Sequence, residues 1–221
     1  MKLGAVTIGQ SPRNDMIADM LPLLGNKADV VQQGALDDLS PEEIQACSPQ
    51  PGDGVLITRL RSGRTVTVAE KHMVRLVQKA VTKLEREGVE LILLLCTGTF
   101  PPLCTQRAVL IRPCDILHQV VPLLSQNSEI IVLVPSPDQV EESTTLWEKY
   151  VKQSTVLSAS PYEGTEGLVQ AARQAQTLPG DTVVLDCMGF SQTAKDVVAR
   201  ESGKRVILSR TLVARVLSEL I

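Results

Sequence analysis

The chain has 221 residues, of which 43% are hydrophobic, 21% are charged and only 2% are aromatic. This composition predicts a globular protein with an aliphatic core, long enough for one large α/β domain or for two of about 110 residues each. The formal net charge of -3 gives no general attraction to nucleic acid, and no apolar stretch approaches the roughly 20 residues that span a bilayer. We therefore expect no nucleic-acid partner, no membrane association and a cytoplasmic location.

Apolar strand-like runs alternate with helix-like segments along the chain, which predicts βα units around a parallel sheet. Ser40-Pro-Glu-Glu43 has the pattern of a capping box and marks a helix start. The apolar runs 55–59 and 65–69 flank a polar stretch with Ser62-Gly63, so they predict a β-hairpin. In the first half we expect strands at 2–8, 29–33 and 90–95 and helices at 12–24, after 40 and at 70–87, the last ending at Gly88.

The second half continues the same alternation. We expect strands at 109–111, 130–134, 155–159, 182–186 and 205–208, with helices between them, one of them at 115–124, and a last helix at the end of the chain.

The two halves show a faint internal duplication. Val6-Thr-Ile-Gly-Gln-Ser11-Pro12 and Ile131-Val-Leu-Val-Pro-Ser136-Pro137 each run from a strand through Ser-Pro into a helix. We place the domain change near residues 101 and 102 and expect the last helix to return to the first half. The predicted organisation is a first α/β lobe of residues 1–101 plus 209–221, with the hairpin as an insertion, and a second α/β lobe of residues 102–208.

Cys96 and Cys187 lie in matching contexts, LeuLeuLeu-Cys96-Thr-Gly98 and ValLeuAsp-Cys187-Met-Gly189. Each follows an apolar run typical of a buried parallel strand, and the carboxyl ends of such strands border the ligand crevice in open α/β sheets. A thiol on each side of a small molecule would suit two-base proton transfer at carbon. The alternative is that each cysteine is only a small buried hydrophobe.

The remaining cysteines and histidines point to no metal. With five cysteines, no CxxC pair and two histidines, the chain fits neither a disulfide framework nor a zinc site. We expect free thiols and no structural metal. The residues assigned to structure are Cys47, Cys104, Cys114, His72 and His118.

Removal of a proton from carbon next to a carboxylate needs a base and fixed donors that stabilise the developing charge on oxygen. A thiol can supply the base where amides, a helix N-terminus or a cation favour its thiolate. We expect both cysteines to end strands and to precede helices, whose positive N-terminal ends would face the sulfur atoms.

Several other polar residues have both a structural and a functional interpretation. Ser11 is either the N-cap of a helix that begins at Pro12 or a cap that also contacts a ligand. Asp186 adjoins Cys187 but should project to the opposite side of the strand. One arginine of the hairpin could grip a carboxylate with its guanidinium fork, while most of the set is expected to be solvated: Arg59, Arg61 and Arg64.

With these residues in view, the chain resembles the AroM protein family. The likeness is carried by Val6-Thr-Ile-Gly-Gln-Ser-Pro-Arg13, by the segment 91–99 and by Leu185-Asp-Cys-Met-Gly-Phe190, and it extends over nearly the whole length. That family is similar in turn to the aspartate/glutamate/hydantoin racemase superfamily, which includes maleate isomerases and arylmalonate decarboxylases. The wider resemblance implies two flavodoxin-like lobes related by a pseudo-dyad, a cofactor-free site between them and, in many members, a homodimer.

The resemblance also implies roles for individual residues. Cys96 and Cys187 occupy the two thiol positions and form the implied catalytic pair. In the superfamily the turn after the first strand holds a substrate carboxylate, and its residues here are Gln10, Ser11 and Arg13. Backbone and hydroxyl donors follow each cysteine, and these positions are Thr97, Gly98, Thr99, Gly189, Phe190 and Ser191.

The chain departs from the amino-acid racemases at both thiols. They usually show Cys-Asn-Thr at the first position and Gly-Cys-Thr at the second, where this chain has Cys-Thr-Gly-Thr and Asp-Cys-Met-Gly. The missing Asn, which would orient an amino group, weakens the case for an amino-acid substrate. The leading hypothesis is a cofactor-independent racemase or isomerase acting at carbon next to the carboxylate of a small acid. The alternatives are a non-catalytic regulatory module that binds small carboxylates, and a thiol-dependent decarboxylase.

Overall fold

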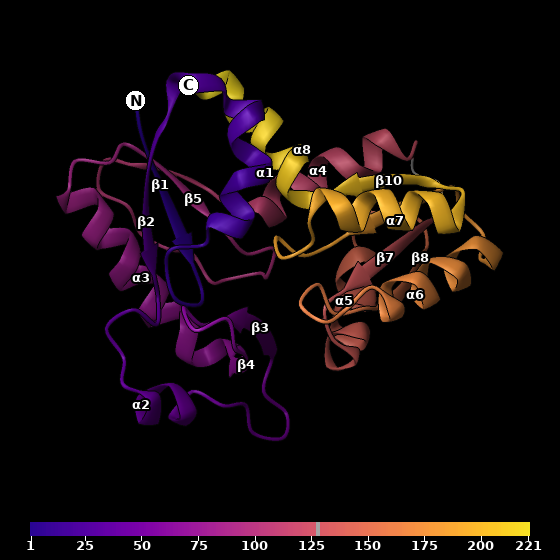
Figure 1. The fold of residues 1–221 in the computed structure, drawn as a ribbon, viewed down its shortest axis with the longest axis horizontal. Helices are drawn as coiled ribbons and strands as arrows, with labels where there is room; N and C mark the ends of the chain where they lie inside the picture. The colour runs from indigo at the N-terminus through magenta and orange to yellow at the C-terminus, as the bar shows by residue number, and fades with distance from the viewer. Residues whose placement is uncertain (127–128) are drawn as a thin grey trace. The chain divides into compact units, whose positions relative to one another are not determined.

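The chain forms two compact α/β units in a computed structural model that describes residues 1–126 and 129–221 (Figure 1). The first unit comprises Met1–Pro113 and Leu217–Ile221, and the second comprises Cys114–Val216. Within the described residues, no helix combines the length and the apolar character needed to cross a membrane.

The first unit is built on a parallel sheet whose four described strands lie in the order β2-β1-β5-β6. The predicted hairpin is confirmed as a separate antiparallel pair, β3 and β4, inserted between β2 and α3. The elements are β1 (Lys2–Thr7), α1 (Asn14–Leu24), β2 (Asp29–Gly34), α2 (Pro41–Ala46), β3 (Val55–Arg59), β4 (Thr65–Ala69), α3 (Glu70–Arg86), β5 (Leu91–Leu94) and β6 (Val109–Ile111).

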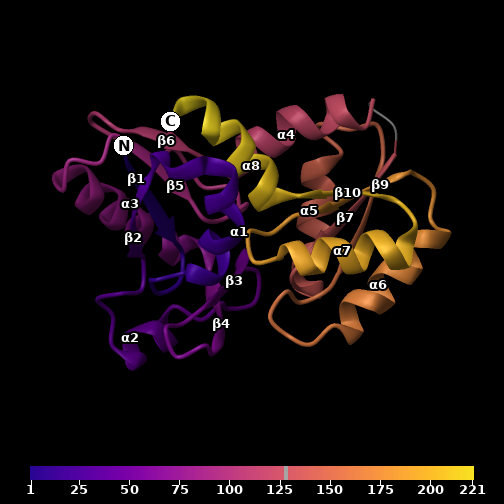
Figure 2. The same cartoon turned by 45° about the horizontal axis from the view of Figure 1, so that its top comes forward.

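The second unit has a parallel sheet whose four described strands lie in the order β10-β9-β7-β8. In both Figure 1 and Figure 2, α6 lies beside α7. The elements are α4 (Pro113–Leu124), β7 (Ile130–Val134), α5 (Val140–Trp147), β8 (Ser154–Ser158), α6 (Glu166–Thr177), β9 (Thr182–Leu185), α7 (Gln192–Ser202), β10 (Arg205–Leu208) and α8 (Ser209–Leu217).

The two sheets have the same topology, which confirms the predicted duplication. When the hairpin is left out, the strands of each unit are arranged second-first-third-fourth, the order with which flavodoxin-like sheets begin. β1 therefore corresponds to β7, and β5 corresponds to β9. The strand at 109–111, which we expected in the second lobe, pairs with β5 and so lies in the first unit. The first unit consequently extends to Pro113 and takes back only Leu217–Ile221 of the chain end.

The aliphatic sequence explains how the sheets are covered. In α3 the buried side chains recur every three or four residues, which places them on one face against β1 and β2. In β7 alternate residues face opposite sides: Ile131 and Leu133 pack with α6 and α7, while Ile130 and Val132 pack with α4 and Trp147. Strands buried on both faces in this way need continuous apolar runs, which is why they could be recognised in the sequence.

Two polar side chains of α3 hold the long segment 95–108 that connects β5 to β6. Gln78 brackets Cys104, since its Nε2 donates to the Cys104 carbonyl and its Oε1 accepts from the Cys104 amide, both at 2.7 Å. Glu85 Oε1 accepts the amides of Gln106, Arg107 and Ala108 at 2.8, 2.9 and 3.0 Å. The segment that begins at Cys96 is thus fixed at its far end by main-chain contacts to one helix.

The Glu85 contacts make the stability of the first unit depend on pH. The amides of Arg107, Ala108 and Gln106 hold the pKa of the Glu85 carboxyl below its ordinary value of 4.5. A lowered pKa in the folded state means that the carboxylate stabilises the fold above its unfolded pKa and that this contribution is lost as the pH falls through the folded value.

We expect Glu85→Gln to melt at a lower temperature than the wild type at pH 7, and the gap to close below pH 4.5 in thermal melts. Glu87→Gln, at the exposed end of the same helix, is the control, and a gap that does not change with pH would contradict the assignment.

Candidate functional site

The two cysteines occupy equivalent positions in the two units. Each lies two residues beyond the end of its strand, Cys96 after β5 and Cys187 after β9. In each case the amide of the glycine two residues later donates to the cysteine sulfur: Gly98 N to Cys96 Sγ at 3.3 Å, and Gly189 N to Cys187 Sγ at 3.3 Å. The matching sequence contexts therefore form matching local structures.

The segments that follow the two cysteines differ. Cys187 leads into α7, whose N-cap is Ser191, with its hydroxyl accepting the Ala194 amide at 3.1 Å. The residues 95–108 after Cys96 contain no helix and run directly to β6, so the predicted helix after Cys96 is wrong. The two thiols also differ in exposure, because the Cys96 residue is 8% exposed while Cys187 is half-buried. A helix N-terminus thus follows the second cysteine only.

The predicted donors after the cysteines are partly engaged within their own segments. Thr97, Gly98 and Thr99 are half-buried. The Phe190 side chain lies in the core of the second unit, and its amide donates to the Cys187 carbonyl at 3.2 Å. Phe190 therefore shapes the segment after Cys187 and presents no side chain to a ligand.

Both glycines after the cysteines fill tight places. A Cβ atom on Gly98 would lie 3.0 Å from Leu56 Cδ2 and 3.4 Å from Cys96 Sγ, and one on Gly189 would lie 2.6 Å from the Tyr162 hydroxyl oxygen. A side chain at either position would displace its neighbours, so the Cys-x-Gly spacing has a packing cause in both units.

The turn after β1 lies at the same sheet edge as Cys96. β1 and β5 are adjacent parallel strands, and the Leu95 amide extends their pairing by donating to the Val6 carbonyl at 2.7 Å. The corresponding strands of the second unit continue in the same way, with the Asp186 amide donating to the Leu133 carbonyl at 2.9 Å. In sheets of this topology, ligands bind at the edge where these two strands end.

Asp37 organises the turn after β1, and we did not identify it from the sequence. Its Oδ1 accepts the Ser11 amide at 2.7 Å, and its Oδ2 accepts the Ser11 hydroxyl at 2.6 Å and the Gly34 amide at 2.7 Å. The Gln33 side chain donates to the same Oδ2 at 3.0 Å. One carboxylate therefore ties the turn to the end of β2. No spacing rule links residues 26 positions apart, so the sequence held no signal for this contact.

The tip of the hairpin closes onto the same turn. Arg61 Nε donates to the Ser11 carbonyl at 2.8 Å, its Nη2 donates to Asp37 Oδ1 at 3.1 Å, and its amide donates to Gln10 Oε1 at 3.0 Å. Gln10 Nε2 donates in turn to the Leu36 carbonyl at 3.3 Å. Arg61 thus bonds both Gln10 and Ser11, and these contacts within the first unit fix the shape of the turn.

Arg13 pairs with a neighbouring carboxylate, and Ser11 does not cap a helix. The Arg13 side chain is 3% exposed and forms a two-pronged pair with Asp15, from Nε at 2.9 Å and from Nη2 at 2.8 Å. α1 begins at Asn14 with Arg13 as its N-cap, so the prediction of Ser11 as the cap of a helix starting at Pro12 is wrong. The physical reason is that the Arg13 amide, which a cap at Ser11 would accept, donates instead to Gln32 Oε1 at 2.6 Å.

Asp186 projects away from Cys187, as predicted. Its Oδ2 accepts Trp147 Nε1 at 2.8 Å, and the Trp147 ring is fully buried in the core between β7 and α4. His118 meets Trp147 edge to face, with ring centroids 5.0 Å apart, and stacks on Tyr150. Cys187 instead packs with the cluster on the other face of the sheet. Asp186 and His118 therefore serve the packing of the second unit.

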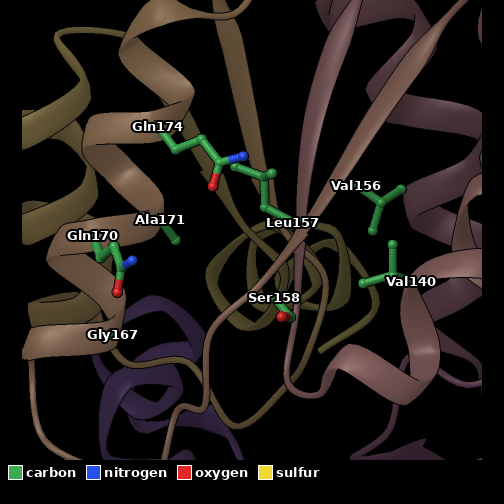
Figure 3. A pocket seen from close by; sticks show the side chains of 8 residues that line it. All are labelled: Val140, Val156, Leu157, Ser158, Gly167, Gln170, Ala171 and Gln174. Atoms are coloured by element: carbon green, nitrogen blue, oxygen red, sulfur yellow. The ribbon is translucent and has the colours of Figure 1, made fainter.

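A cavity of about 340 Å³ in the second unit is lined by residues of β8, α5 and α6 and includes neither cysteine. Gln170 and Gln174 project into it from α6 toward Leu157 on β8, and Val140 and Val156 line the opposite wall (Figure 3). None of the residues that the sequence singled out lines this cavity. Among the described residues, no group of three or more His, Cys, Asp or Glu side chains is arranged to hold a metal ion.

Removal of the Asp37 carboxylate should loosen the turn after β1. Asp37→Ala leaves the Ser11 and Gly34 amides without their acceptor, and we expect it to lower the free energy of unfolding by about 3 kcal/mol, as for loss of a partly buried charged hydrogen-bond acceptor. Asp38→Ala is the matched control, because Asp38 is exposed and its pair with Lys79 at 3.1 Å is worth less than about 1 kcal/mol. Urea unfolding of the two variants measures the difference, and equal losses would show that Asp37 does not organise the turn.

Comparison with known proteins agrees with the duplicated α/β architecture. Among solved structures, the chain is similar to an allantoin racemase from Klebsiella pneumoniae (14% identity, 100% of this chain and 87% of that one, TM-score 0.62). It is also similar to a glutamate racemase from Aquifex pyrophilus (16%, 100% and 84%, TM-score 0.60) and to a maleate isomerase from Pseudomonas putida S16 (10%, 100% and 92%, TM-score 0.62). At these identities the likeness is one of fold.

The sequence comparison is more specific. No match was found among curated proteins. The description "AroM protein" belongs to a family whose sequence pattern matches residues 3–221, nearly the entire chain. With the paired Cys-x-Gly strand ends and the duplicated sheet already established, this match shows that the chain belongs to the AroM protein family.

Proposed function

We propose that this protein is a racemase or isomerase that acts, without a cofactor, at carbon next to the carboxylate of a small acid, with Cys96 and Cys187 as its acid/base pair. The observation that carries the proposal is the equivalence of the two thiols: each lies two residues beyond the third strand of its parallel sheet and accepts the amide of the glycine two residues later at 3.3 Å. An amide directed at sulfur favours the thiolate, which is the form that acts as a base. The fold shared with racemases and with a maleate isomerase supports the same reaction class.

The proposed reaction moves one proton in each half-step. One thiolate removes the proton from the carbon next to the carboxylate, and the electron pair of the broken C–H bond moves onto the carboxylate oxygens. The other thiol then donates its proton to the opposite face of that carbon, so the centre is inverted and the two sulfur atoms exchange protonation states. Donors that face the carboxylate in this step stabilise the charge that develops on its oxygens.

We assign these donors to the segments after the cysteines and to the turn after β1. The half-buried Thr97 and Thr99 have hydroxyl groups for the carboxylate, while the amides of Gly98 and Gly189 are directed at the sulfur atoms, so we assign these two glycines the shaping of the binding segments. Ser191 accepts a bond as the cap of α7 and has one O–H left to donate. Gln10, Ser11 and Arg13 complete the proposed binding set, with their bonds to Asp37, Arg61 and Asp15 holding them in place.

A second candidate is a regulatory module that binds a small carboxylate without turnover. It is favoured by the burial of Cys96 and by the prior engagement of Gln10 and Ser11 in the turn, which leave the first unit less open to chemistry than the second. The thiol-dependent decarboxylase remains a third proposal, because it would need only one reactive cysteine, for which the half-buried Cys187 is the better placed.

Deuterium exchange distinguishes these candidates. The wild type should transfer deuterium from heavy water to the carbon next to the carboxylate in at least one member of a panel of small dicarboxylic, hydroxy and amino acids, measured by NMR. Cys96→Ala and Cys187→Ala should each slow the interconversion of enantiomers or isomers by about 10²–10⁴-fold, the usual contribution of a positioned acid or base. Cys104→Ala, at an exposed thiol, is the matched control.

Exchange that survives both catalytic-site substitutions would exclude the two-thiol mechanism. A compound that raises the melting temperature but exchanges no deuterium would favour the regulatory module, and loss of carbon dioxide that needs only Cys187 would favour the decarboxylase.

A further inference from the structure

Arg210 is a buried cation that the proposed reaction does not yet use. It lies in the first turn of α8, its residue is 1% exposed, and it reaches the segment after Cys187. Its Nε and Nη2 donate to the Met188 carbonyl at 2.9 and 2.7 Å, and the same Nη2 donates to the Gly189 carbonyl at 2.8 Å. Burial of a charged group costs free energy because the group loses its hydration, and these hydrogen bonds compensate for that loss.

Two successive peptide groups connect Arg210 to Cys187. The Met188 carbonyl and the Gly189 amide belong to one planar peptide unit, whose oxygen accepts from Arg210 and whose N–H donates to Cys187 Sγ at 3.3 Å. The Gly189 carbonyl and the Phe190 amide form the next unit, whose oxygen also accepts from Arg210 and whose N–H donates to the Cys187 carbonyl at 3.2 Å. In a trans peptide the oxygen and the N–H point in opposite directions, so each unit has the guanidinium at one end and Cys187 at the other.

This arrangement affects the sulfur in two ways. The guanidinium fork fixes the orientation of both peptide units and hence the direction of the Gly189 N–H. A cation bonded to the carbonyl oxygen also polarises the peptide, because hydrogen bonds in a chain strengthen one another at low dielectric. The Gly189 N–H is then a stronger donor to the thiolate than an amide without this partner.

The other titratable groups near this segment are accounted for by their contacts. Asp186 accepts Trp147 Nε1 at 2.8 Å on the opposite face of the sheet, and the Tyr162 hydroxyl lies against Gly189. The negative charge of a carboxylate at Asp186 would disfavour a thiolate at Cys187. The Tyr162 phenol has no positive charge with which to favour one. Of these three groups, the guanidinium of Arg210 has the charge that favours the anion.

We propose that Arg210 is the positioning residue of Cys187: acting through the 188–189 and 189–190 peptide units, it makes Cys187 the more readily ionised thiol and the resting base of the pair. This inference rests on the proposed function for its catalytic meaning, but its test measures the thiol itself and needs no substrate.

The test is residue-resolved alkylation by iodoacetamide, followed by mass spectrometry across pH 6 to 10, on the wild type, Arg210→Met and Arg210→Lys. In Arg210→Met, Cys187 should react about tenfold more slowly at pH 7, as expected for a tenfold smaller thiolate fraction, and its pH profile should move to higher pH. Arg210→Lys keeps the charge but loses the guanidinium fork, so its Cys187 alkylation rate should lie between those of the wild type and Arg210→Met. Arg215→Met, at an exposed position of the same helix, should react as the wild type does.

The other cysteines make the experiment decisive. The buried thiols Cys47 and Cys114 report unfolding, so their faster labelling would mark a variant that has lost its structure. If Arg210→Met is lost in this way, the Cys187 rate in Arg210→Lys tests the proposal. A purely structural role would expose Cys187 and speed its alkylation, the opposite of the expected sign. An unchanged or faster Cys187 rate in a folded variant would overturn the proposal. A slower Cys187 rate in a protein that exchanges no deuterium would retain Arg210 as the positioning residue and remove the proposed reaction.

Discussion

Parallel strand pairing is the constraint from which the rest of this structure follows. Strands covered by helices on their faces have to be continuous aliphatic runs, and their main-chain groups are satisfied along the ladder until the carboxyl ends, where the chain leaves the sheet. At these ends, amides become available to bond something other than a neighbouring strand. In both units one such amide bonds a cysteine sulfur, and in both it belongs to a glycine for which packing leaves no side-chain space. The placement of chemistry-bearing residues is thus set by where the ladder stops.

The regular elements were predictable because their causes are local or periodic. The capping box at Ser40 is present as expected, and α3 ends before Gly88, which has a φ of 79°. The hairpin was evident from two short strands around a polar turn, and the matching of Cys96 with Cys187 was evident from the sequence because each follows an aliphatic run. The position of β6 was less predictable, since a strand of three residues carries no mark of its partner, and its pairing with β5 moved the unit boundary to Pro113.

The residues that support the candidate site could not be found from spacing, because they act across long stretches of chain. Asp37 bonds a turn 26 positions earlier, Glu85 bonds amides more than 20 positions later, and Arg210 bonds carbonyls 21 and 22 positions earlier. Their partners are mostly main-chain groups, which every residue has and which therefore leave no signature in the sequence. The same effect explains the misplaced N-cap: Ser11 has the right residue type before Pro12, but the Arg13 amide that it would cap donates to the side chain of Gln32, 19 positions later. The unexpected loop after Cys96 is likewise stabilised from α3 by Gln78 and Glu85 rather than by helix formation of its own.

The contact between Arg210 and residue 188 is made through the carbonyl and not through the side chain. Any residue whose side chain fits the buried space at this position supplies an equivalent carbonyl, so the methionine that stands where amino-acid racemases usually have threonine costs the sulfur none of its support. Under our proposal, residue 188 is constrained by the volume and hydrophobicity of its side chain, because the contact with Arg210 uses only its carbonyl. Under our proposal, a relative with the same arrangement would be recognised by an arginine at the start of the last helix rather than by the residue that follows the cysteine.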